Sequence, residues 1–100
     1  ETGLPTHAAA FFKRLTELEP SLPGPHHNLG VCCFLRHKFG EGITHCLRAL
    51  EIQPDYIMAM HKLALAYLHL GRWSEARRMI RRALAADLNR LLELFGKIGQ

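Results

Sequence analysis

Histidine and cysteine side chains occur in one stretch of this chain at spacings that could bring several metal ligands together. Cys33 and His37 are four residues apart and share one face of an expected helix, and the pair His45-Cys46 follows on the next helix. Four such side chains can in principle converge on zinc. The chain has neither a CxxC pair nor an HxxxH pair, which are common zinc-ligand spacings. We therefore expect no metal and no cofactor.

Four arginines form a second cluster on one side of an expected helix: Arg77, Arg78, Arg81 and Arg82. Positive charge concentrated in this way can bind phosphate, an acidic peptide or nucleic acid. Apart from Trp73, the segment lacks interleaved aromatic residues on which bases would stack. We therefore expect a solvated basic face, and nucleic acid is not the expected partner.

The carboxylates do not form a catalytic set. They are scattered along the expected helices, and no nucleophile, base and orienting group stand together. The chain also has no glycine-rich phosphate-binding loop. We expect this segment not to be an enzyme by itself.

The composition bounds the class of protein. The 100 residues carry a net charge of +4 and allow one small domain. Charged residues or histidines interrupt every hydrophobic stretch, so we expect no membrane insertion. Residues 1–3, Glu1-Thr2-Gly3, look like a remnant that a secretion vector leaves after signal cleavage, and we exclude them from the fold. We expect a cytoplasmic protein, with the secretory pathway or ER lumen as the alternative.

Helical spacing of apolar residues, together with proline and glycine, predicts the elements that position these side chains. Pro5 suits the first turn of the first helix, Gly40 marks the turn after the second, and Asp55 is the expected N-cap of the fourth. The expected helices cover 5–18, a second ending near 37, 41–52, a fourth ending at 71, 73–86 and an amphipathic 88–98. We expect no sheet.

One spacing organises these helices. Pro20 and Pro54 are 34 residues apart, and the same interval joins Leu29-Gly30 to Leu63-Ala64. Cys33 and Tyr67 repeat it again. A fixed period of this length predicts a stacked array of small helical units. Because such arrays present surfaces, the period favours binding over catalysis.

The repeated pattern resembles the tetratricopeptide repeat, with its Leu-Gly or Leu-Ala pair, a small residue opening the second helix and a closing proline. The resemblance implies an all-α helix-turn-helix solenoid of about two and a half repeats plus a C-terminal capping helix. Its parts are a half-repeat over 4–20, repeats over 23–56 and 57–90, and the capping helix over 88–98, all in one domain. Leu88 replaces the closing proline of the last repeat, so the chain is expected to continue helically into the cap.

The resemblance also assigns core positions. Gly30 and Gly42 are expected to let the two helices of one unit approach closely. Cys33 and Cys46 fall at core positions of the same unit, which favours two buried thiols over a zinc site. A Cys33–Cys46 disulfide is the alternative in an oxidising compartment.

The half-repeat lacks the first helix of its own unit. Phe11 or Phe12 is therefore expected to be exposed at the N-terminal end of the array. Self-association through this end, a partner helix or a larger parent array would each cover it.

In tetratricopeptide arrays the first helix of each unit lines a concave surface that holds a peptide, and the resemblance carries this role to the matching positions. The expected peptide groove consists of His27, Asn28, Val31, Phe34, Met58, His61, Lys62, Leu65 and Leu68. Asn28 and Lys62 match two positions that hold a C-terminal carboxylate in similar proteins, but Met58 stands where a second lysine is expected. An amphipathic helix or an apolar extended segment suits the groove better.

Three functions follow from these patterns. The leading interpretation is a protein–protein interaction module, an adaptor or scaffold that binds a peptide or helix in the groove. The alternative is an accessory domain of a larger enzyme, such as a secretory-pathway transferase or hydroxylase. The third is phosphate or nucleic-acid binding through the arginine cluster, which the resemblance places on the convex face. Packing of the groove residues on one another stays open as the structural alternative.

Overall fold

The computed structural model describes residues 3–98, which form five helices and no strand. The helices are α1 (Leu4–Leu18), α2 (Pro23–Leu35), α3 (Phe39–Ile52), α4 (Ile57–His69) and α5 (Trp73–Ile98). The prediction of an all-α fold is confirmed. Residues 1–2 of the expected N-terminal remnant lie outside the described range.

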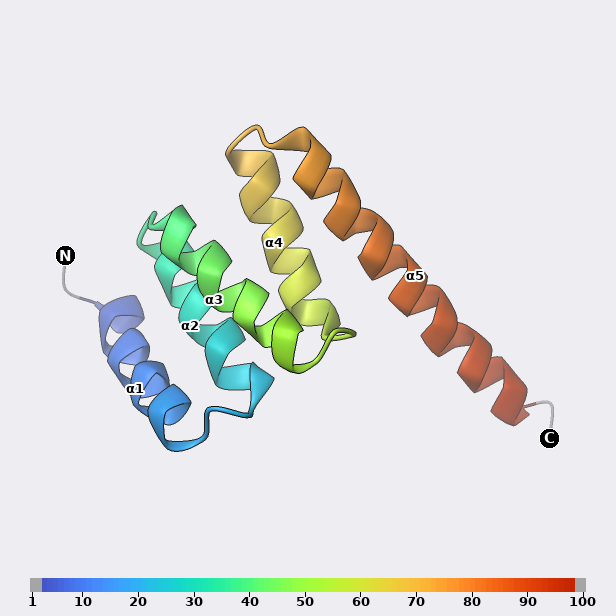
Figure 1. Cartoon of the computed structure of the whole chain (residues 1–100), viewed down its shortest axis with the longest axis horizontal. Coiled ribbons are helices and arrows are strands. Elements are labelled where there is room, and N and C mark those ends of the chain that lie inside the picture. Colours follow the sequence, from blue (N-terminus) through green and yellow to red (C-terminus); the bar gives the residue numbers. More distant parts are fainter. Residues whose placement is uncertain (1–2, 99–100) are drawn as a thin grey trace.

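The helices stack in chain order into an elongated row, with α1 at one end and α5 at the other (Figure 1). Each helix packs against the next from α1 to α5, and α2 also contacts α4. The principal extents of the row are 52 × 34 × 21 Å. None of the described helices combines the length and the apolar character needed to cross a membrane.

The hydrophobic core lies between α3, α4 and α5. Leu63 on α4 and Cys46 on α3 are completely enclosed, and Met79 and Ala83 close the core from α5. In contrast, α1 has no fully buried residue. The ring of Phe11 is 60% exposed, which confirms the expectation of an uncovered aromatic residue at this end.

Two glycines allow α2 and α3 to cross closely. A Cβ atom on Gly30 would lie 2.7 Å from Cys46 Sγ and 2.9 Å from the carbonyl oxygen of Gly42. A Cβ atom on Gly42 would collide with the Phe34 ring and lie 2.9 Å from the carbonyl oxygen of Gly30. Because one obstacle in each case is backbone, neither site can accept a methyl group without moving the helices apart.

The turns after α2 and α4 are built alike, one 34-residue period apart. The N–H of Lys38 donates to the carbonyl of Cys33, and the N–H of Arg72 donates to that of Tyr67, both at 2.8 Å. This bond is the signature of a helix that ends in a left-handed residue. That residue is His37 in the first turn, with φ of 60°, and Gly71 in the second, with φ of 72°.

Three predicted boundaries were wrong. Gly40 lies inside α3, and His37 makes the turn instead. The N-cap of α4 is Tyr56 without a side-chain cap bond, not Asp55, and α4 ends at His69, before Gly71. In both turns the left-handed residue follows the helix, so the helix must end before it.

The expected helices over 73–86 and 88–98 form one continuous helix, α5, of 26 residues, in line with the helical continuation expected at Leu88. The sequence Ala-Asp-Leu at 86–88 contains no helix breaker, so the helix continues. Its C-terminal part extends beyond α4 (Figure 1), and Leu88, Leu91, Leu92 and Phe95 are each at least 50% exposed. The segment expected to cap the array therefore does not cover its end. The side chain of Ile98, the last residue of the expected stripe, lies outside the described residues.

Candidate functional site

A cavity of about 280 Å3 lies between α2 and α4 and reaches the start of α3. Its lining consists of Val31, Phe34, Leu35, Phe39, Lys62, Leu65, Ala66 and His69. Lys62 contributes the one formal charge of this lining, which is otherwise apolar or aromatic. We call this cavity with its lining residues the α2–α4 groove.

Aromatic rings form the wall of the α2–α4 groove at its α3 end. The Phe39 ring stacks on His69 with 4.4 Å between ring centroids, and it also stacks on Phe34 at 6.0 Å. Phe34 in turn packs over Gly42, where no side chain competes for the space. These ring pairs add favourable contact energy beyond the apolar area that they bury. Leu65 is 61% exposed on the opposite helix and available to a ligand.

The structure places four of the predicted groove residues in this cavity: Val31, Phe34, Lys62 and Leu65. Met58 and His61 are exposed and line a separate hollow of about 370 Å3, next to Tyr56, Asp87 and Arg90. Leu68 lies outside the α2–α4 groove and is 39% exposed.

His27 is buried, and its assignment as a surface contact is corrected. Its side chain is 2% exposed, and its ring meets Tyr56 edge-on with centroids 5.7 Å apart. The Nδ1–H group of His27 donates to Asn28 Oδ1 at 3.1 Å, so the half-buried Asn28 amide already has a partner. The imidazole fills the space between α2 and the start of α4, because Tyr56 closes over it.

Burial also sets the charge of this histidine. Desolvation lowers the pKa of His27, the hydrogen bond that His27 donates to Asn28 opposes this shift, and the positive charge of Lys62 adds to it. Nε2 has no hydrogen-bond partner among the described residues. The neutral ring is therefore the favoured form in the folded protein.

Sequence reasoning missed Leu35, Phe39, Ala66 and His69. Leu35 and His69 are separated by the 34-residue period, so the repeat itself could have identified them as equivalent lining positions. Phe39 opens α3, and its contribution depends on how tightly the preceding turn brings α3 to α4. No sequence pattern reports that distance.

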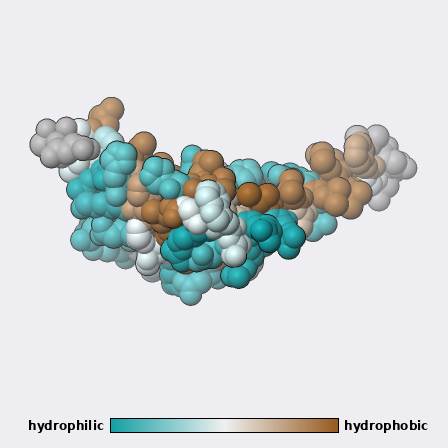
Figure 2. All heavy atoms as spheres, turned by 90° about the horizontal axis from the view of Figure 1, so that it is seen from above, coloured by the Kyte–Doolittle hydropathy of each residue, from teal (hydrophilic) through white to brown (hydrophobic). Residues whose placement is uncertain are grey.

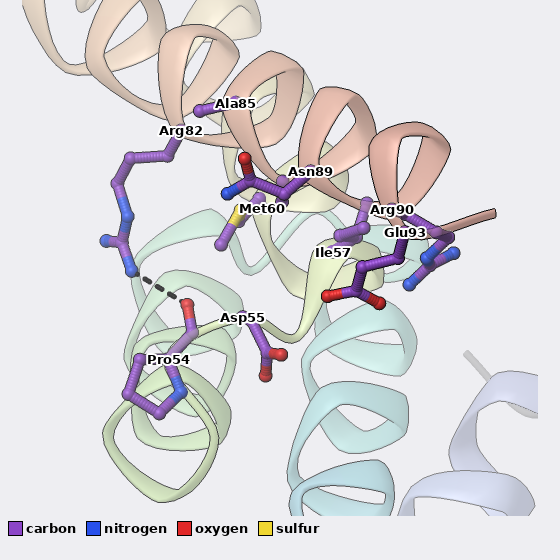
Figure 3. Close-up of a pocket in the computed structure, with 10 residues that line it drawn as sticks. Pro54, Asp55, Ile57, Met60, Arg82, Ala85, Asn89, Arg90 and Glu93 are labelled. Carbon is purple, nitrogen blue, oxygen red and sulfur yellow. Dashed lines mark hydrogen bonds between the residues drawn. The ribbon is translucent and has the colours of Figure 1, made fainter. Parts of the chain in front are cut away.

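The four residues of the arginine cluster are all exposed. Arg82 differs from the others in that its Nη2 also donates to the carbonyl of Pro54 at 3.2 Å. That bond crosses a hollow of about 400 Å3 beside the α3–α4 turn, where Asp55, Arg90 and Glu93 also lie (Figure 3). Charges of both signs line this hollow, so it is not a pocket selective for anions.

The cysteines are free and buried. Burial raises the pKa of Cys33 and that of Cys46, the latter to about 12, so both thiols stay protonated and unreactive. The structure shows no Cys33–Cys46 bond. Among residues 3–98, no group of three or more histidine, cysteine, aspartate or glutamate side chains is placed to hold a metal.

Comparison with known proteins places this geometry in a family. A family model for the tetratricopeptide repeat matches residues 23–89, which covers all of α2, α3 and α4 and most of α5. The chain belongs to the tetratricopeptide repeat family.

Tetratricopeptide proteins with similar sequences are much longer than this chain. It is 32% identical over 71 residues to the TPR repeat-containing thioredoxin TTL4 of Arabidopsis thaliana, and covers 10% of it. It is 31% identical over 75 residues to the inactive TPR repeat-containing thioredoxin TTL3 of the same plant, and covers 11% of it. The chain thus spans about a tenth of these relatives.

Two solved structures share the fold. MamA superposes with a TM-score of 0.80 at 22% identity, over 86% of this chain and 49% of that one. The first TPR domain of Spaghetti (RPAP3), bound to the HSP90 peptide SRMEEVD, superposes with a TM-score of 0.80 at 19% identity, over 96% of this chain and 83% of that one. At these identities the likeness shows the fold alone.

Proposed function

We propose that this tetratricopeptide unit binds an apolar segment of a partner protein in the α2–α4 groove. The observation that carries the proposal is the groove itself, an open apolar cavity walled by Phe34, Phe39 and His69 and bordered by the exposed Leu65. Pockets of this kind take up apolar side chains, because burial removes apolar surface from water on both partners. The similarly folded Spaghetti domain holds a peptide, which supports a binding role for this fold.

The polar groups at the groove favour an apolar segment over a terminal carboxylate. Asn28 does not line the groove, and Met58 contributes no charge. Lys62 is the one formally charged side chain of the lining that can meet an anion or a backbone carbonyl of the ligand. One cation on an apolar wall fixes the orientation of a ligand but does not enclose a carboxylate.

Peptide display tests the groove directly. Random peptides displayed on phage are selected against the wild-type chain, and a selected peptide is then titrated as a soluble molecule by calorimetry. Leu65→Glu places a charge at the rim and is expected to weaken binding by about tenfold or more. Leu84→Glu is the matched control, because Leu84 on α5 is 63% exposed and lies outside the groove. Equal affinity for wild type and Leu65→Glu would contradict the proposal.

A second candidate function is that of an accessory domain within a larger enzyme. Both plant relatives are named as thioredoxins, and this chain matches about a tenth of each. In that case the groove would hold a segment of the same polypeptide or of its substrate. Leu65→Glu, introduced into a full-length protein that contains this chain, would then change the activity of the neighbouring domain and not that domain's own stability.

A further inference from the structure

An apolar stripe runs along α5 on a side that α4 leaves uncovered. Its members are Ile80, Leu84, Leu88, Leu91 and Phe95, which are between 39% and 64% exposed. They are successively four, four, three and four residues apart, so they share one face of the helix. Apolar side chains follow the extended arm of α5 in the space-filling view (Figure 2). We call these five residues the α5 stripe.

The fold supports only the first half of α5. The helix has 26 residues against 13 in α4, so at about 1.5 Å per residue it is about twice as long. Its buried residues, Ala76, Met79 and Ala83, all lie in the first half. The second half, which carries Leu88, Leu91 and Phe95, therefore has an apolar face without a core to cover it.

We propose that a second copy of this chain covers the α5 stripe by antiparallel pairing of the two α5 helices. In a two-fold interface, if one residue of the first copy contacts a second residue of the other copy, the same two positions also make contact with the copies exchanged. With the axis near Leu88, Ile80 faces Phe95 of the second copy, Leu84 faces Leu91, and Leu88 faces Leu88. The stripe satisfies this requirement because its spacing is almost the same in both directions of the helix.

Charge selects the antiparallel direction. Arg77 and Arg81 lie on the stripe side of the first half, one turn from Ile80 and Leu84. A parallel pair would set each arginine against its own copy. The antiparallel pair sets them against the second half of the other helix, where Arg81 reaches the level of Phe95 and can stack on its ring.

The remaining charges agree with this direction. The first half of α5 carries Arg77, Arg78, Arg81 and Arg82 against one acidic residue, whereas the second half balances two basic with two acidic residues. Antiparallel pairing therefore puts each basic half beside a neutral half. It also puts each extended half beside the part of the other α5 that α4 supports. None of the stripe residues belongs to the α2–α4 groove, so the pair would present two free grooves.

Sedimentation equilibrium of the 100-residue chain tests the pairing. The wild type is expected to approach twice the monomer mass as its concentration rises, and Leu84→Glu is expected to remain at the monomer mass with unchanged helicity by circular dichroism. Leu65→Glu is the matched control, because Leu65 is similarly exposed on α4, and it should dimerise like the wild type. A wild type that is monomeric up to millimolar concentration, or a Leu84→Glu variant that still dimerises, would overturn the proposal.

Cysteine cross-linking tests the register. Leu88→Cys lies at the two-fold axis and is expected to form a disulfide between copies under mild oxidation, because the natural cysteines are buried. Ile80→Cys alone should not cross-link, whereas Ile80→Cys combined with Phe95→Cys should. Efficient cross-linking of Ile80→Cys alone would show a parallel pair and overturn the antiparallel register.

Discussion

The units over 23–56 and 57–90 have equivalent sequences but different surroundings. Cys46 and Ile80 occupy the same repeat position, yet Cys46 is completely buried and Ile80 is 39% exposed. The reason is the neighbour: α4 packs over Cys46, whereas no described helix packs over the same side of α5. In an array of this kind, the repeat position of a residue determines which way its side chain faces. The next unit then determines whether that side chain is buried or exposed.

The two units also differ in the residues at which their helices cross. The first unit uses Gly30 and Gly42 at the crossing, and the second uses Ala64 and Ala76. Both alanines are buried and belong to the hydrophobic core between α3, α4 and α5. The crossing of the first unit has no room for a methyl group at either glycine, and Phe34 occupies the space that one at Gly42 would need.

The largest expected effect comes from a substitution that disrupts the crossing of α2 and α3. Gly30→Ala should lower the free energy of unfolding by about 3 kcal/mol, because its methyl group meets both Cys46 Sγ and the backbone of Gly42. Gly40→Ala is the matched control, since a Cβ atom there meets nothing within 4 Å and α3 should gain about 0.5–1 kcal/mol. Urea denaturation measures both. If Gly30→Ala lowered the free energy of unfolding by no more than Gly40→Ala changes it, the crossing of the first unit would not depend on glycine.

The second effect sharpens the contrast between His27, which is buried, and its repeat equivalent His61, which is exposed. Because burial lowers the pKa of His27 below its ordinary value of 6.5, the unfolded chain binds a proton at higher pH than the folded one. Stability should be full above pH 6.5 and fall as the pH drops below it, by up to about 1.4 kcal/mol per pH unit.

Denaturant unfolding over this pH range checks the assignment. His27→Gln should flatten the pH dependence. Part of the slope will remain in His27→Gln, because burial also lowers the pKa of His45. The same slope in His27→Gln as in the wild type would show that His27 titrates alike in both states.

The smallest expected effect comes from substitutions at the left-handed residues of the two turns. His37 holds a positive φ that a side chain disfavours, whereas Gly71 holds the same conformation without that cost. His37→Gly should raise the free energy of unfolding by roughly 1 kcal/mol, and Gly71→Ala should lower it by about the same amount. Thermal unfolding of both variants measures the difference, and equal signs for the two changes would contradict the equivalence of the turns.

Much of the fold could be predicted because it depends on local periodicity. Helical spacing and the interval of 34 residues indicated α1 to α4 and the close approach at Gly30 and Gly42. The helix ends were less predictable, since Gly40 and Asp55 have the right chemistry for a turn and a cap, but Gly40 lies three residues after the turn residue His37 and Asp55 one residue before the N-cap Tyr56. The candidate site was half predictable: Val31, Phe34, Lys62 and Leu65 line the α2–α4 groove, whereas His27 does not.

The sequence by itself determined the repeat, the pairing of helices within it and the position of each side chain on its helix, because these depend on intervals along the chain. Only the tertiary structure decided which of those positions are buried. Tyr56 closes over His27, and the turn at His37 brings Phe39 against His69, while α5 continues past its support and leaves its stripe in solvent. Burial depends on what another segment places opposite a residue, and that arrangement is a property of the packed array.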